Sequence, residues 1–118
     1  MPIATINPAT GETVKTFTPA TDADVEAAIT RAHERFLDYR HSTTFAQRAE
    51  WANATADLLE KEADDVGAMM TLEMGKTLKS AKAEALKCAK GFRYYAENAE
   101  KFLADEPSEA SKVGAKRA

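Results

Sequence analysis

The chain has 118 residues, of which 44% are hydrophobic and 30% charged, and its net charge is −3. This length suits one small domain, the composition is that of a globular protein, and the mild mixed charge argues against nucleic acid or a membrane surface as partner. No apolar run approaches the roughly 20 residues that span a bilayer. The N-terminus has no secretory pattern, and a single cysteine fits a reducing compartment, so we expect a cytoplasmic protein.

The first 20 residues predict a β-hairpin. Strand-forming residues stand on both sides of a turn that Asn7-Pro8 begins and in which Gly11 supplies a positive φ. The strand formers are Ile3, Thr5 and Ile6 before the turn, and Thr13, Val14, Thr16 and Phe17 after it. A lone hairpin is marginally stable in water, so we expect this one to pack on another element.

Residues 21–104 predict three amphipathic helices, which makes the expected fold class mainly α. Thr21 with Asp24 predicts the first N-cap, and Thr44 with Gln47 resembles a capping box for the second helix. That second helix would run unbroken over 44–74, about 45 Å at about 1.5 Å per residue, with Gly67 as a soft point. Residues 105–118 are expected to be a polar tail or an incomplete strand.

Apolar stripes follow each predicted helix at spacings of three and four. They are Val25, Ile29, Ala32, Phe36 and Tyr39; then Ala52, Ala56, Leu59, Ala63, Val66 and Met70; then Leu78, Ala81, Ala85, Cys88, Phe92, Tyr95, Ala99 and Phe102. Such faces suit burial on a core or on neighbouring helices, and we expect them to be exposed in a piece separated from its partner.

The stretch "TLEMGKTL", residues 71–78, contains a Gly-Lys-Thr triplet that invites comparison with a phosphate-binding loop. Such a loop needs a glycine five positions before Gly75, where Met70 stands, and a preceding strand, where a helix is expected. Gly75 instead fits a helix C-terminus, with Lys76 near the exposed carbonyls and Thr77 capping the next helix.

The residues show no credible active site. Cys88 lies within a helix stripe, where a small buried hydrophobe is expected rather than a nucleophile. His33 and His41 lack a third ligand at metal spacing. The group Phe92, Tyr94 and Tyr95 fits core packing, and the acids Glu60, Glu62, Asp64 and Asp65 fit a solvated face.

Three stretches in order resemble the aldehyde dehydrogenase superfamily. "INPATGETV" is similar to its opening hairpin, "FRYYAENAEKFLADE" to the end of a later helix, and the intervening helices carry its R…L…L-x-x-x-E-x-GK…A-x-x-E pattern. That pattern falls on Arg48, Leu58, Leu59, Leu72, Glu73, Gly75, Lys76, Ala81 and Glu84, although the family often has proline where Thr77 stands.

The resemblance implies the N-terminal part of a larger α/β enzyme. The sequence of the helices is most similar to that of the bacterial succinate-semialdehyde dehydrogenases. The resemblance also implies a small aldehyde as substrate, NAD or NADP as cofactor bound outside this segment, and a homo-oligomer. The catalytic cysteine, oxyanion asparagine and glutamate base would lie beyond residue 118, so no catalytic, cofactor-binding or metal residue is assigned here. Lys87 and Gly91 would face the aldehyde entrance. A stand-alone three-helix module that binds other proteins is the alternative.

Overall fold

A computed structural model describes residues 3–107 of the chain. The element order is β1 (Ile3–Ile6), β2 (Thr13–Phe17), α1 (Asp22–Ser42), α2 (Phe45–Lys61), α3 (Ala63–Met74) and α4 (Leu78–Phe102). The prediction of a mainly helical chain that opens with a hairpin is therefore confirmed. Residues 105–107 have no regular structure, and the rest of the predicted polar tail lies outside the described residues.

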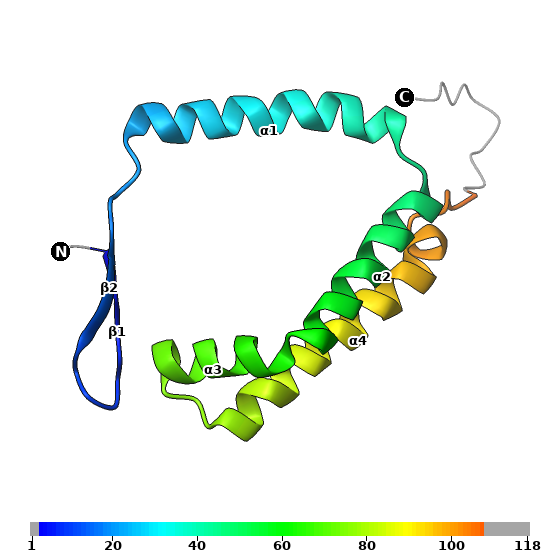
Figure 1. Ribbon diagram of the computed structural model, residues 1–118. Coiled ribbons are helices and arrows are strands. Elements are labelled where there is room, and N and C mark those ends of the chain that lie inside the picture. The colour runs from blue at the N-terminus through cyan, green and yellow to red at the C-terminus, as the bar shows by residue number, and fades with distance from the viewer. Residues whose placement is uncertain (1–2, 108–118) are drawn as a thin grey trace.

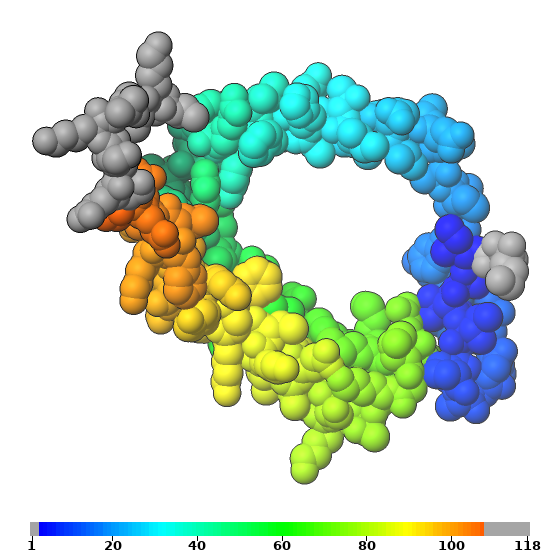
Figure 2. Space-filling view, turned by 180° about the vertical axis from the view of Figure 1, so that it is seen from behind, coloured from blue at the N-terminus to red at the C-terminus, as the bar shows by residue number. Residues whose placement is uncertain are grey.

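The elements are arranged as an open ring (Figure 1). Helix α1 forms one side, α2 and α4 lie side by side on another, and α3 leads back toward the hairpin. Figure 2 shows an opening through the middle. The radius of gyration is 21.1 Å, whereas a compact domain of this length has about 13 Å. The chain by itself therefore does not close around a single core.

The hairpin and two helix starts follow the predicted local chemistry. β1 and β2 pair antiparallel, with Ile3 opposite Phe17, and Gly11 in the turn has a φ of 75°. Thr21 with Asp24, and Thr44 with Gln47, each form a complete capping box at the N-terminus of α1 and of α2. These reciprocal bonds satisfy amides that a helix end leaves without partners.

The cap of α1 makes this helix sensitive to acid. Hydrogen bonds from the Thr21 side chain and backbone hold the pKa of Asp24 below its ordinary value of 3.8. Because the folded pKa is depressed, the stabilisation is present above pH 3.8 and is lost as the pH falls through the folded pKa. We expect Asp24→Asn to reduce helicity at neutral pH and to flatten its fall below pH 4, by circular dichroism. Asp22→Asn is the matched control, and an equal effect of both variants would contradict this assignment.

The predicted second helix is divided at Glu62, so the expectation of one continuous helix over 44–74 is wrong. Glu62 has φ −102° and ψ 14°, and it ends α2 and begins α3 without a side-chain cap. The bend keeps Ala63 and Gly67 against α4, where both are buried. One straight helix with the same stripe satisfies the sequence pattern equally well, so only packing reveals the break.

Small residues alone fill the core between α2, α3 and α4. Within residues 3–107 the buried hydrophobic side chains are Ala56, Ala63, Ala81, Ala85 and Ala89. Three of these recur every fourth residue along α4 and form the alanine seam, Ala81, Ala85 and Ala89. Small side chains at a contact let helix axes approach closely. The sequence stripe included the first two members of the seam and missed Ala89.

Gly67 extends this close contact to α3. A Cβ atom at Gly67 would lie 2.7 Å from Cγ and 3.2 Å from the backbone nitrogen of Lys82 on α4. The sequence predicts that Gly67 weakens the helix locally. In the structure Gly67 instead makes room for the neighbouring helix α4, and the helix bends five residues earlier, at Glu62.

Most large apolar side chains of the predicted stripes are exposed, as expected of a piece separated from the body it packs on. Phe92, Tyr94 and Tyr95, expected in the core, are 42%, 52% and 62% exposed. Helix α1 buries no residue along its 21 positions. Large exposed apolar surfaces on a folded chain commonly mark contacts with another body.

Candidate functional site

The "TLEMGKTL" stretch is the corner between α3 and α4. Gly75 has a φ of 67°, and its amide donates to the Thr71 carbonyl oxygen at 3.0 Å. Helix α3 precedes it, so the predicted helix stop is confirmed and the stretch lacks the strand of a phosphate loop. Two details differ from expectation. Lys76 forms an ion pair with Glu84 rather than facing the carbonyls, and Thr77 occupies the N-cap position of α4 without a side-chain bond.

The hairpin meets this corner at two points. The Thr5 hydroxyl donates to Glu73 Oε1 at 3.0 Å. Pro8 lies beside Gly75, where an added Cβ would come within 3.1 Å of Pro8 Cγ. The hairpin therefore contacts the corner at two points, but β2 is exposed along its whole length, so the hairpin does not pack on another element as expected. Gly75 combines a positive φ with this close approach, and both favour glycine.

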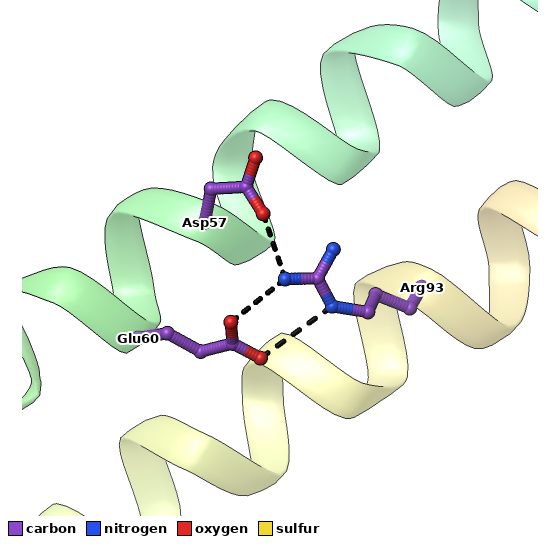
Figure 3. Close-up of polar contacts among 3 residues, drawn as sticks. All are labelled: Asp57, Glu60 and Arg93. Carbon is purple, nitrogen blue, oxygen red and sulfur yellow. Dashed lines mark hydrogen bonds and ion pairs between the residues drawn. The ribbon is translucent and has the colours of Figure 1, made fainter.

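The most connected polar cluster joins α2 to α4 (Figure 3). Arg93 Nη2 donates to Asp57 Oδ1 and to Glu60 Oε2, each at 2.7 Å, and Arg93 Nε donates to Glu60 Oε1 at 3.4 Å. The hydrogen bonds to Glu60 raise the pKa of Arg93 above its ordinary value, and the hydrogen bond to Asp57 makes a smaller contribution in the same direction. Its guanidinium therefore stays charged and acts as a bridge between helices. Neither acid lies beside a nucleophile, so the geometry is that of a structural contact.

A second ion pair links α3 to α4, between Lys82 and Asp64. Together with the Arg93 bridge it places acids of α2 and α3 against bases of α4 on the flanks of the alanine seam. Sequence reading assigned Glu60 and Asp64 to a plain solvated face. Their partners lie at least 18 positions away along the chain, a separation that helical periodicity does not encode.

Cys88 is exposed on α4, which corrects the expectation of a buried small hydrophobe. His33 and His41 lie on α1, which does not pack along α4. No group of three or more histidine, cysteine or acidic side chains within residues 3–107 is placed to hold a metal ion. None of the helices in the same range has both the length and the apolar character to cross a bilayer.

Lys87 and Gly91 lie one helical turn apart on α4, so the structure places them on one face. Lys87 is exposed, and Gly91 is half-buried with no atom within 4 Å of where its Cβ would be. Open space beside a glycine lets another group approach the helix backbone. The role of this pair at an aldehyde entrance stays a prediction.

A model of the aldehyde dehydrogenase family matches residues 1–116. The chain belongs to the aldehyde dehydrogenase family. Over all 118 residues it is 86% identical to a succinate-semialdehyde dehydrogenase [NADP(+)] of Mycobacterium avium and 80% identical to one of Mycobacterium tuberculosis. It spans 25% and 26% of the length of these two relatives, to whose N-terminal segment it corresponds.

Solved structures of family members contain the same arrangement of elements. A succinic semialdehyde dehydrogenase of Streptococcus pyogenes in complex with NADP+ matches with a TM-score of 0.86 and 31% identity, over 92% of this chain and 24% of that one. A betaine aldehyde dehydrogenase of Staphylococcus aureus with NAD+ matches with a TM-score of 0.78 and 28% identity, over 86% and 21%. The open ring is therefore the form that this segment takes within larger aldehyde dehydrogenase chains.

Proposed function

We propose that these residues serve as the N-terminal scaffold of an NADP-dependent dehydrogenase that oxidises succinic semialdehyde to succinate. The observation that carries the proposal is the 86% identity over all 118 residues to the Mycobacterium avium enzyme. Family membership by itself leaves the cofactor open, because one structural relative holds NADP+ and another NAD+. The choice of NADP and of this aldehyde rests on the high-identity relatives.

The scaffold role explains why the chain is open. Within residues 3–107 the buried hydrophobic side chains are alanines, while Ile29, Phe36, Trp51 and Leu58 remain about half exposed. In the proposed enzyme the remaining three quarters of the polypeptide cover these side chains. A stand-alone module of three helices accounts less well for the arrangement, because α1 is held away from the others instead of completing a bundle with them.

By the family resemblance, the chemistry belongs to residues outside this chain. A cysteine thiolate would attack the aldehyde and a carboxylate would activate the water that releases the acid, while the nicotinamide cofactor would supply the chemistry of a hydride acceptor. The 118 residues hold the surrounding structure in place. The corresponding full enzyme is expected to be a cytoplasmic homo-oligomer.

The test compares the 118-residue chain with the polypeptide encoded by the full reading frame around it. We expect the long form to reduce NADP+ with succinic semialdehyde, and to prefer this aldehyde to an uncharged one of similar size. The 118-residue chain is expected to reduce neither NADP+ nor NAD+. Nicotinamide reduction by the short chain alone would overturn the scaffold role, and a long form inactive on succinic semialdehyde would overturn the substrate.

Lys87 gives the proposed substrate a specific test. A lysine near the aldehyde entrance attracts the free carboxylate of succinic semialdehyde by about 1 kcal/mol at an exposed position. Lys87→Glu in the full enzyme removes this attraction and adds a repulsion of similar size, a change of about 2 kcal/mol. We therefore expect it to raise KM for succinic semialdehyde about 30-fold, and to leave kcat and uncharged aldehydes little changed.

Lys101→Glu is the matched control. It makes the same charge change on α4 about 21 Å further along, at about 1.5 Å per residue. Equal KM values for Lys87→Glu, Lys101→Glu and the unsubstituted enzyme would show that Lys87 does not lie at the aldehyde entrance.

A further inference from the structure

Gly91 differs from the other glycines of residues 3–107, because nothing within the chain accounts for it. Gly11 and Gly75 have a positive φ, and Gly67 makes room for Lys82. Gly91 lies within helix α4, where a Cβ atom would have no neighbour within 4 Å. Glycine inside a helix is less stable than alanine. The structure therefore shows a destabilising residue at this position without a contact that requires it.

The missing side chain of Gly91 leaves a hollow on the surface of α4. On a helix the neighbours of such a position stand three and four residues away, and here they are Lys87, Cys88, Tyr94 and Tyr95. All four are exposed, and none comes within 4 Å of the Cβ position. The hollow at Gly91 is therefore open to whatever body lies beside this face of the helix.

Three aromatic rings stand beside the hollow and form an aromatic cluster. The ring centres of Tyr94 and Tyr95 are 5.4 Å apart, and that of Phe102 lies 6.0 Å and 6.4 Å from them. The rings contact one another, yet the three residues are 52%, 62% and 52% exposed. Aromatic side chains are enriched in the buried centre of contacts between folded bodies. The aromatic cluster and the hollow therefore offer a protruding apolar surface next to a gap, a shape that a second body can cover and fill.

We propose that, in the full enzyme, main chain of the remaining polypeptide fills the hollow at Gly91, while apolar side chains of the same segment cover the aromatic cluster. A glycine lets another backbone approach a helix closely, because it has no side chain to hold that backbone away. A remaining polypeptide is expected because the chain spans 25% of the length of its Mycobacterium avium relative and 24% of the Streptococcus pyogenes structure. The identity of the occupant rests on the proposed function, whereas the hollow does not.

The test introduces side chains at Gly91 in two forms of the protein, the 118-residue chain and the polypeptide encoded by the full reading frame. In the short chain, Gly91→Ala should raise the urea midpoint, because only helix propensity changes. In the long form the added methyl group meets the segment that fills the hollow, and overpacking should lower the midpoint. Gly91→Leu should lower the midpoint of the long form further. Ala54→Gly, at an exposed position of α2, is the control and should lower the midpoint of both forms.

A midpoint that Gly91→Ala lowers in the long form but not in the short chain would support the proposal. A midpoint of the long form that is raised or unchanged would overturn it, and a raised KM for succinic semialdehyde in that variant would instead assign the hollow to the aldehyde entrance. A midpoint lowered in both forms would also overturn the proposal, because the reason for glycine would then lie within the 118 residues. The proposed function is tested separately, by the activity of the unsubstituted long form.

Discussion

Alanine at position 67 is expected to destabilise the chain, although glycine-to-alanine changes inside helices ordinarily stabilise. The gain in helix propensity is about 1 kcal/mol. Against it, the new Cβ would lie 3.2 Å from the Lys82 backbone nitrogen and 2.7 Å from Lys82 Cγ. Overpacking of this kind costs about 1–3 kcal/mol. Because a backbone atom of α4 must move, the steric cost exceeds the gain, and we expect a net loss of about 1 kcal/mol.

The same substitution at Gly91 should change the free energy of unfolding in the opposite direction. Gly91 also lies inside a helix, but no atom lies within 4 Å of its Cβ position. Only the propensity term remains, so Gly91→Ala should stabilise by about 0.5–1 kcal/mol. Urea midpoints of helical circular dichroism, at one fixed chain concentration because association shifts apparent stability, give both values. Urea midpoints that shift in the same direction for both variants would show that α3 does not pack on α4 as described.

Leucine at position 85 should separate α4 from the helices that it contacts. Ala85 is 1% exposed and stands at the centre of the alanine seam, where the close approach leaves no room for a branched side chain. A core of large residues can adjust its rotamers around an added group, but alanines have none to adjust. We therefore expect Ala85→Leu to lower the free energy of unfolding by about 3 kcal/mol, the upper part of the overpacking range.

Ala83→Leu provides the control, because Ala83 is exposed on the same helix. The two variants have the same composition and nearly the same helix propensity, and they differ only in the face of α4 that they enlarge. Urea midpoints should fall strongly for Ala85→Leu and change little for Ala83→Leu. Equal midpoints for the two would contradict the alanine seam.

Local chemistry made part of the fold predictable from sequence. The hairpin turn, the capping boxes at Thr21 and Thr44, and the left-handed Gly75 each depend on residues within a few positions of one another, so their residue types suffice. The family could be recognised because three such local motifs occur in a fixed order.

The remaining features depend on contacts between distant parts of the chain. The break at Glu62 and the burial of Ala89 follow from where α4 packs, which a periodic stripe does not specify. Arg93 finds Asp57 and Glu60 at separations of 36 and 33 residues. Cys88 was expected to be buried because its stripe is apolar, yet nothing among the described residues covers it. Under the proposed function that error and the open ring have the same cause, since the rest of the enzyme would cover these faces.

The account depends most on the claim that these helices present apolar faces shaped for a body outside the chain. Sedimentation velocity of the 118-residue chain over a range of concentrations, with a thermal melt of the same samples, tests this claim most directly. We predict association that grows with concentration, because exposed apolar faces pair with one another, and a melting temperature that rises with concentration. A monomer at every concentration, with a cooperative melt whose temperature does not change with concentration, would contradict the account.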